Sequence, residues 1–344
     1  MINWTLRFSV SATDFHRFSR NTKENRFEIC GDPCNLWQEL PFQATNKMLA
    51  RLQMVNALTV DVEAWHHAEI VRRHVPDSER FSQVPEALAG LRRLFQRKRV
   101  RATFFVVGEV VRQHPDLIRE LHDEGHEIGC HTMSHRRLGE LGEEAFRAEL
   151  AAFAALTGDI LGPGFSPAGF RAPTFSLDQS TSWAIHALAD AGYRYDSSVF
   201  PLRNPLYGVA DCPPAPYRIA PADVSRAAPA NGLLWEFPLP VLRLGPAKLP
   251  LAGGFYLRLL PLPVIVRGLR CLNDAGIPFT IYVHPWETHP GTPRVKTLSP
   301  TDRFITYHNV DGALTKLSAL LDRFRFAPMH EALDAARVDE KGGS

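Results

Sequence analysis

The sequence predicts an α/β fold in which about seven parallel strands alternate with helices and curl into a distorted (β/α) barrel. From residue 57 onward, short runs rich in β-branched and aromatic residues alternate with longer amphipathic runs, as in parallel βαβ units. A helix that ends in glycine also leads directly into a strand at three places, Gly125, Gly192 and Gly276. A doubly wound open sheet fits the same alternation.

The expected strands and helices follow one another in order. The strands are residues 57–62, 101–107, 126–131, 169–173, 193–198, 233–239 and 278–284, and the helices are residues 84–98, 115–125, 143–158, 180–192, 264–276 and 311–326. In the first helix, Leu88, Leu91 and Phe95 share one face, which is typical of an amphipathic helix. Residues 201–263 carry many prolines and interrupt the alternation, so we expect an elaborated loop region there and not a second domain.

Periodicity divides the chain into three parts. Residues 1–53 show no clear strand or helix period, so we expect a poorly ordered N-terminal extension or a misassigned start. Residues 54–330 form the expected barrel domain, and residues 331–344 form a C-terminal tail. The N-terminus lacks a continuous apolar core and a small-residue cleavage site, so no secretion signal is expected.

Composition excludes several classes of protein. The 344 residues include 39 basic and 37 acidic ones, well mixed, with a net charge of +2, so neither a nucleic-acid partner nor a lipid surface is indicated. No run approaches the ~20 apolar residues of a membrane span. Cys30 and Cys34 form a lone C-x-x-x-C without a second pair, which does not predict a zinc ribbon. We expect reduced thiols and a cytoplasmic location; the oligomeric state is left open.

Polar or ionisable residues stand where the expected strands end. They are Asp61, Glu63, His131, Arg171, Asp196, Glu236 and His284, with His135 four residues after His131. In a parallel β/α barrel the carboxyl ends of the strands meet on one face and carry the chemistry. The sequence therefore predicts that these side chains form one site.

Five ordered motifs resemble those of a known family. They are TVDVEAW, HTMSH, FRAP, YDSS and YVHPWE, and they resemble the carbohydrate (polysaccharide) deacetylases with a NodB-type homology domain over about residues 57–326. The resemblance implies a distorted barrel of about seven strands. It also implies metal-dependent removal of an acetyl group from an N-acetylated sugar, or a related carbon–nitrogen hydrolysis. Residues 235–261 are similar to a segment of members associated with exopolysaccharide production.

One motif departs from the common family pattern. Many members carry two adjacent aspartates on the first strand, whereas this chain has Asp61 and Glu63 with Val62 between them. A subgroup spaces its acidic pair in this way, and this chain resembles that subgroup. Positions 61 and 63 point to the same side of a strand, so both carboxylates can reach one site.

The resemblance implies a metal site and four residues that act around it. Glu63, His131 and His135 would bind one divalent ion and leave positions open for water and substrate. Zinc is the expected ion, and ferrous iron or cobalt suits the same ligands.

Four other residues receive catalytic roles in this interpretation. Asp61 would be the general base, and His284 the general acid that protonates the leaving amine. Arg171 would hold Asp61 in place and keep it ionised. Asp196 would orient His284 and keep it protonated. For Arg171 and Asp196, a purely structural salt bridge is the alternative.

Four residues are candidates for binding the substrate, an N-acetylated sugar or glycan. Trp65, Tyr256 and Trp286 could form a platform on which a sugar stacks, and His67 could line the site. The alternative for the aromatic residues is a place in the core, and for His67 a spare polar contact.

Two other functions remain open from the sequence. One is a cyclic-amide or allantoinase-like hydrolase, since the fold alone does not set the substrate. The other is a non-catalytic scaffold that binds glycan. The presence of the acidic pair together with His284 favours a hydrolase over the scaffold.

The absence of periodicity before residue 57 generates a prediction. Removal of residues 1–50 is expected to leave folding and metal binding intact, because that segment is not expected to supply a barrel strand. Thermal unfolding and metal content of the truncated protein check this. An insoluble truncated protein, or one with no cooperative melting transition, would show that the extension is structural.

Overall fold

The computed structural model of the protein describes residues 54–202, 207–229, 232–245, 247–251 and 253–342. All of these belong to one compact unit. The predicted N-terminal extension, residues 1–53, lies outside the described residues. No helix in the described part of the chain is long and apolar enough to cross a bilayer.

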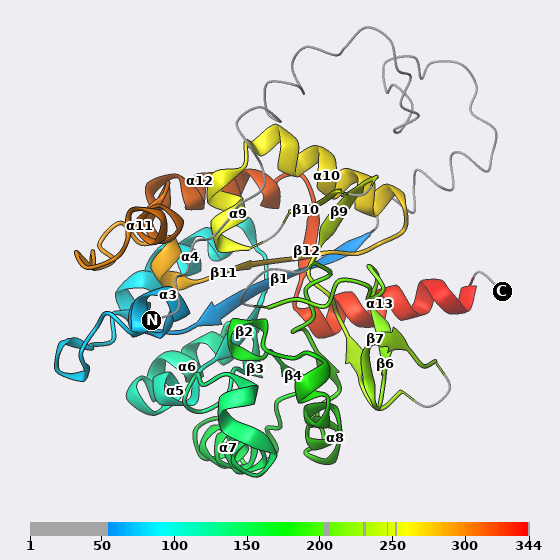
Figure 1. The fold of residues 1–344 in the computed structure, drawn as a ribbon, viewed down its shortest axis with the longest axis horizontal. Helices are drawn as coiled ribbons and strands as arrows, with labels where there is room; N and C mark the ends of the chain where they lie inside the picture. The colour runs from blue at the N-terminus through cyan, green and yellow to red at the C-terminus, as the bar shows by residue number, and fades with distance from the viewer. Residues whose placement is uncertain (1–53, 203–206, 230–231, 246, 252, 343–344) are drawn as a thin grey trace, which may run out of the picture. The chain divides into compact units, whose positions relative to one another are not determined.

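Seven parallel strands form the centre of the fold, which confirms the predicted class (Figure 1). They lie in the order β11, β1, β2, β3, β4, β5, β8. Their bounds are β1 Val55–Val62, β2 Thr103–Val106, β3 Glu127–Cys130, β4 Gly169–Phe170, β5 Tyr195–Asp196, β8 Trp235–Glu236 and β11 Thr280–Val283. Strand β12 (Arg325–Ala327) adds a further parallel partner to β1. Within the described residues no strand pairing joins β11 to β8, so the sheet is curled but not closed.

Helices cover the outer face of the sheet. The longer ones are α4 Val84–Lys98, α6 Pro115–Asp123, α7 Leu138–Leu161, α8 Trp183–Asp190, α10 Leu262–Asp274, α11 Pro300–Tyr307 and α12 Val310–Leu321. The short ones are α3 Glu69–Arg72, α5 Gly108–Gln113 and α9 Gly254–Leu259. Val71 of α3 and Tyr307 of α11 belong to a separate cluster. Alternate residues of β1, Leu58, Val60 and Val62, share one large buried cluster with the apolar faces of the other helices. Burial of this cluster supplies the main hydrophobic stabilisation of the fold.

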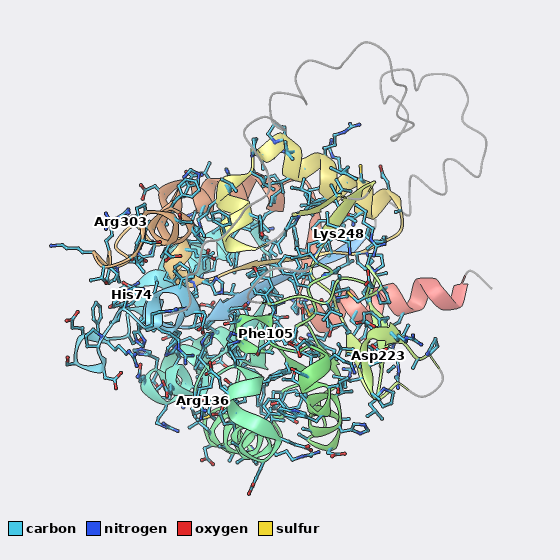
Figure 2. The ribbon with its side chains drawn as sticks, viewed as in Figure 1. His74, Phe105, Arg136, Asp223, Lys248 and Arg303 are labelled. Carbon is cyan, nitrogen blue, oxygen red and sulfur yellow. The ribbon has the colours of Figure 1, made fainter. Side chains whose placement is uncertain are left out.

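The inner face of the sheet holds a second, smaller cluster. Phe105, Tyr195 and Phe237 pack there with Ala57. Phe105 lies near the middle of the view in Figure 2, whereas the exposed Arg303 lies at its left edge. Helix α13 (Met329–Gly342) contributes Met329, Ala332 and Leu333 to this cluster. Residues 331–342, which the sequence analysis assigns to a C-terminal tail, thus belong to a helix whose first turns are part of the core.

The region 201–263 contains more regular structure than the expected loop. It includes two hairpins, β6 (Tyr217–Ala220) with β7 (Asp223–Ala227) and β9 (Val241–Leu244) with β10 (Ala247–Pro250), and helix α9. Strand β6 pairs antiparallel with β8 and so extends the main sheet. Described prolines such as Pro216, Pro221 and Pro238 lie outside the strands, and Pro250 is the last residue of β10, whose partner among the described residues is β9. At such positions a missing N–H removes no ladder hydrogen bond of the main sheet.

The last expected helix is shorter than its sequence pattern suggests. The pattern predicts a helix up to residue 326, but residues 325 and 326 form the start of β12. Phe324 and Phe326 both pack edge-on against Phe279, and residues 325–327 pair with the first residues of β1. This pairing joins segments about 270 residues apart and therefore overrides the local helical pattern.

Candidate active site

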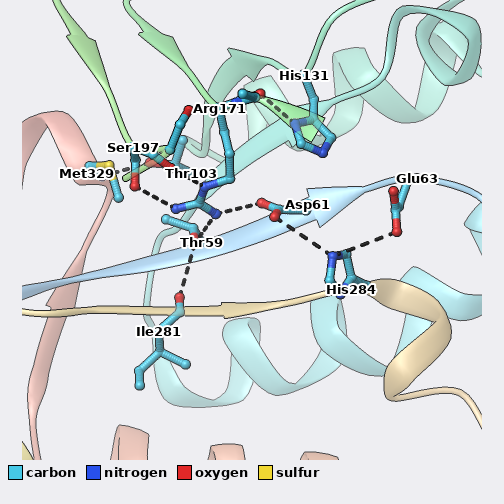
Figure 3. A network of polar contacts seen from close by, with 12 residues as sticks. Thr59, Asp61, Glu63, Thr103, His131, Arg171, Ser197, Ile281, His284 and Met329 are labelled. Atoms are coloured by element: carbon cyan, nitrogen blue, oxygen red, sulfur yellow. Dashed lines mark hydrogen bonds and ion pairs between the residues drawn. The ribbon is translucent and has the colours of Figure 1, made fainter. Parts of the chain in front are cut away.

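The predicted residues converge at the carboxyl ends of four strands (Figure 3). Asp61 and Glu63 come from β1, His131 from β3, Arg171 from β4 and His284 from β11. Asp61 and Glu63 are each only 2% exposed, and Arg171 has no exposed surface. Charged groups with so little access to water must be paired within the protein, and the contacts below supply those pairs.

Glu63, His131 and His135 form a compact set of ligand atoms. One atom from each lies within 4.8 Å of the others, and Glu63 Oε2 is in direct contact with His135 Nε2. Burial would raise the pKa of Glu63, but the nearby imidazoles of His135 and His284 outweigh burial and hold this pKa well below its ordinary value. An ionised carboxylate beside two imidazoles is a donor set that suits a divalent cation.

The tautomer and the charge of the His131 ring suit a metal ligand. Its Nδ1 lies 2.7 Å from the backbone carbonyl oxygen of Arg171, so this nitrogen donates its proton and Nε2 is left with a free electron pair. Burial lowers the pKa of His131 to about 4 in spite of the nearby Asp61. The imidazole is therefore neutral near pH 7, which is the form that binds metal.

The loop after β3 holds His135 in an uncommon backbone conformation. Thr132 and His135 have φ of 61° and 54°, values that cost energy for residues other than glycine. The backbone N–H of His135 donates to Thr132 Oγ1 at 3.0 Å, and Glu149 of α7 accepts from the backbone of Met133 at 2.8 Å. These bonds turn the chain so that both histidines face Glu63.

Arg171 is in direct contact with Asp61. Its Nη1 lies 2.6 Å from Asp61 Oδ1 and also donates to Thr59 Oγ1 at 2.8 Å. Its other nitrogens donate to the carbonyl and hydroxyl oxygens of Ser197 at 2.9 Å and 2.8 Å. The guanidinium lies 4.4 Å from the centre of the Phe105 ring. Asp61 therefore has one oxygen held and the other, Oδ2, directed towards His284.

His284 lies across the site from Asp61. Its Nε2 is 3.9 Å from Asp61 Oδ2 and 3.7 Å from Glu63 Oε1, while its Nδ1 lies 2.6 Å from Glu287 Oε2. Burial would lower the pKa of His284, but Glu287, Glu63 and Asp61 outweigh it and raise the pKa to about 9. The imidazole consequently holds a proton at neutral pH, as a general acid must.

The carboxylate beside His284 is Glu287, not Asp196, so the predicted role of Asp196 is wrong. Asp196 accepts from the hydroxyl of Ser198 at 2.6 Å and from its backbone N–H at 3.1 Å. It also hydrogen-bonds Glu236 on the neighbouring strand β8. Glu287 lies three residues after His284 in a 3₁₀ turn, and this geometry places residues i and i+3 side by side. The spacing H-x-x-E was therefore a usable signal in the sequence.

The two tryptophans do not form a sugar platform. Trp65 is 5% exposed, packs with Val71 and Val75, and donates its indole N–H to the carbonyl of Phe81 at 3.2 Å. Trp286 is 7% exposed, donates to Glu63 Oε1 at 2.9 Å, and stacks on His284 with ring centres 5.2 Å apart. Both are buried, so neither offers an open ring face; Trp286 instead supports an acid residue and a ligand.

The other two substrate candidates lie near the site. His67 stacks on His135 with ring centres 5.3 Å apart, and its Nε2 lies 3.6 Å from Glu109. Tyr256 is half-buried and packs beside a cluster that includes Phe175, Phe200 and Tyr282. Their predicted contact with substrate stays a prediction.

Comparison with known proteins agrees with this geometry. Residues 81–195, which include both histidine ligands and Arg171, match the family model of the polysaccharide deacetylases. Over these residues the chain is similar to the polysaccharide deacetylases. Residues 197–334 match a separate family described as a domain of unknown function, DUF3473, so the deacetylase model itself does not include His284 or Glu287.

Individual relatives are similar over shorter stretches. A peptidoglycan-N-acetylglucosamine deacetylase of Bacillus cereus is 34% identical over 88 residues, which are 25% of this chain and 30% of that protein. A chitooligosaccharide deacetylase of Rhizobium leguminosarum is 48% identical over 52 residues, 15% of this chain and 24% of that protein. The matches thus span less than a third of these relatives. A solved structure from Mycobacterium smegmatis, assigned to the polysaccharide deacetylases, covers 83% of this chain and 92% of its own, with a TM-score of 0.50 and 18% identity; it supports the fold.

The buried pair of Asp196 and Glu236 predicts a dependence of stability on pH. Burial raises the pKa of both carboxyls, and Asp196 raises that of Glu236 further. As pH rises above the unfolded-chain values of about 4, the unfolded state ionises while the native pair keeps a proton. The free energy of unfolding should therefore fall until the pH passes the native pKa values.

Glu236→Gln should make this decline smaller, because the amide can donate to Asp196 while its oxygen still accepts from Val199 N–H. Urea unfolding of the wild type and the variant between about pH 4 and pH 9 measures the difference. The exposed Glu144 of α7 provides the control Glu144→Gln. If the free energy of unfolding falls equally steeply with pH in the wild type and in Glu236→Gln, the pair of Asp196 and Glu236 does not bind a proton on folding.

Proposed function

We propose that this protein is a metal-dependent hydrolase that removes the acetyl group from N-acetylated sugars in a polysaccharide. One observation carries the proposal: a three-residue ligand set lies beside a fixed carboxylate, Asp61, and a charged imidazole, His284. Amide hydrolysis needs both a base for the attacking water and an acid for the departing amine. The site supplies the two within 3.9 Å of each other.

Glu63, His131 and His135 would hold the metal ion, for which we propose zinc. A divalent ion bound there polarises the carbonyl oxygen of the acetyl group and makes water more acidic. The chain contributes the orientation of its ligands: the Arg171 carbonyl fixes the ring of His131, and the Trp286 indole fixes Glu63. Such supporting contacts strengthen metal binding.

Asp61 acts as the base. Its Oδ1 is held by the Arg171 guanidinium at 2.6 Å. Its Oδ2 is left to accept a proton from the attacking water. Because Arg171 is itself fixed by Thr59 and Ser197, the carboxylate cannot rotate freely, and little orientation entropy is lost when water and substrate bind.

His284 acts as the acid. Its Nδ1–H is directed at Glu287, so the proton that can be transferred is the one on Nε2, which faces Asp61 and Glu63. An amine is a poor leaving group until it is protonated, so this transfer completes the cleavage of the carbon–nitrogen bond. The raised pKa of about 9 keeps the imidazole charged at neutral pH.

The relatives suggest the class of substrate. They are deacetylases of peptidoglycan N-acetylglucosamine and of chitooligosaccharides, and we propose an N-acetylated hexosamine unit for this chain. The similarity of residues 235–261 to exopolysaccharide-associated deacetylases supports an extracellular polysaccharide, or its precursor, as the polymer.

Acetate release tests the proposal. The purified protein should release acetate from at least one of a panel of N-acetylated glycans, and chelation followed by zinc addition should abolish and then restore the release. Hydrolysis that continues at full rate in demetallated protein would contradict the metal dependence. Hydrolysis of cyclic amides without any acetate release would favour the allantoinase-like alternative.

The neighbouring residues Asp61 and Glu63 allow the two roles to be separated. Asp61→Asn should keep the metal and lose about 10²-fold or more of the turnover, because a lost general base costs this much. Glu63→Gln should lower metal affinity as well as turnover. Metal analysis and acetate release on both variants check the assignment; if Asp61→Asn loses the metal and Glu63→Gln is the milder change, the two roles are exchanged.

A further inference from the structure

The start of helix α9 lies against the carboxylate that contacts His284. This helix, Gly254–Leu259, belongs to the stretch matched by the domain of unknown function, and the deacetylase family model ends before it. Glu287 is 3% exposed. A buried carboxylate of this kind has to be neutralised by partners within the protein, and α9 supplies one of them.

Arg258 of α9 is that partner. Its side chain is 1% exposed, and its Nη2 lies 2.8 Å from Glu287 Oε1. The other carboxylate oxygen of Glu287 accepts from His284 Nδ1 at 2.6 Å. Arg258 and Glu287 are buried and His284 is partly exposed. The three form a continuous chain of charges, in which one oxygen of Glu287 binds Arg258 and the other binds His284.

Two glycines bring the helix close enough for this contact. A methyl group added at Gly254 would overlap the Glu287 carboxylate, and one added at Gly253, whose φ is 102°, would overlap the ring of Tyr282. Only glycine allows the backbone to approach the carboxylate and the ring so closely. The two glycines of the sequence GGFYLR therefore leave the space that the Glu287 carboxylate and the Tyr282 ring occupy.

We infer that α9 is a positioning element of the active site: Arg258 fixes Glu287, and Glu287 fixes the ring of His284 so that Nε2 faces Asp61 and Glu63. This inference rests on the proposed function and assigns part of that function to the segment of unknown role. The guanidinium can hold the carboxylate in one plane because it presents several donors in a rigid arrangement. Without it, Glu287 would be a buried charge with one partner and would be free to turn away from His284.

Arg258 also has contacts that could matter only for folding. It donates to the backbone carbonyls of His308 and Ile305 at 2.6 Å and 2.9 Å. Lys316 of α12 provides a matched control, because its Nζ donates to the carbonyls of Arg258 and Leu260 at 2.7 Å and 2.8 Å and so holds the same helix. A change at Lys316 disturbs the anchoring of α9 and leaves the Arg258–Glu287 pair in place.

Substrates with different leaving groups can distinguish a positioning role of Arg258 from a general loss of active-site structure. Loss of His284 orientation should slow release of an amine, which needs a proton, far more than release of 4-nitrophenolate, which leaves without one. Arg258→Gln should therefore lower acetate release from an N-acetylated glycan by about 10²-fold, and lower hydrolysis of 4-nitrophenyl acetate by no more than about threefold. Arg258→Lys should keep part of the amide activity that Arg258→Gln loses. Gly254→Ala should show the same selective loss as Arg258→Gln. Lys316→Met should lower the rates on the glycan and on the aryl ester equally, or lower neither.

A double-mutant cycle tests whether Arg258 acts through Glu287. If it does, Arg258→Gln combined with Glu287→Gln should lose little more amide activity than Glu287→Gln alone. Additive losses, or equal losses on the glycan and the aryl ester in Arg258→Gln and Gly254→Ala, would overturn the inference and leave Arg258 with a structural role.

Proton NMR spectroscopy tests the inference without a measurement of turnover. In the wild type, the Nδ1–H proton of His284 should appear at low field because it is bonded to Glu287, and His284→Asn identifies the signal by its loss. The signal should disappear or move in Arg258→Lys and Gly254→Ala and stay in Lys316→Met. An unchanged signal in all variants would overturn the inference, whereas a wild type that releases no acetate from any substrate would contradict the proposed function alone.

Discussion

A guanidinium with no exposed surface lies at the centre of the site, and the surrounding structure keeps it paired. Arg171 is in contact with Asp61, Thr59 and Ser197 and lies against the ring of Phe105. Removal of a charge from water costs several kcal/mol unless close partners offset it. The curled sheet brings these partners together from three strands that are distant in sequence. The position of the catalytic base is thus a consequence of how the fold accommodates one buried cation.

The acid side of the site repeats this arrangement with the charges reversed. Glu287 is buried between Arg258 and His284, and these two cations outweigh the effect of burial and lower its pKa to about 2. Two buried ion pairs therefore hold the catalytic groups: Arg171–Asp61 fixes the base, and Arg258–Glu287 fixes the acid through the contact of Glu287 with His284. The ligands of the proposed metal lie next to both, since Glu63 contacts His135 and approaches His284. A substitution in either arginine should therefore act on chemistry at a distance from the ligands themselves.

The sequence was informative about the residues at strand ends and less so about their partners. Parallel strands place their carboxyl ends at one edge, so Glu63, His131 and Arg171 could be assigned to one site from their order alone. That rule does not say which carboxylate reaches His284. It favours Asp196, at the end of another strand, over Glu287, which lies in the same turn as His284. Trp65 and Trp286 illustrate another limit, because composition does not show whether an aromatic ring is buried or open. Strand β12 depends on a pairing with residues about 270 positions away, which no local pattern reveals.

X-ray absorption of the protein loaded with zinc tests the central claim most directly, because it reports the ligand atoms. The account predicts two imidazole nitrogens and carboxylate oxygen, with no sulfur. It also predicts an unchanged protein ligand set in Asp61→Asn and the loss of one imidazole in His131→Ala or His135→Ala. A sulfur ligand, or a spectrum that is the same in the two histidine variants as in the wild type, would contradict the account.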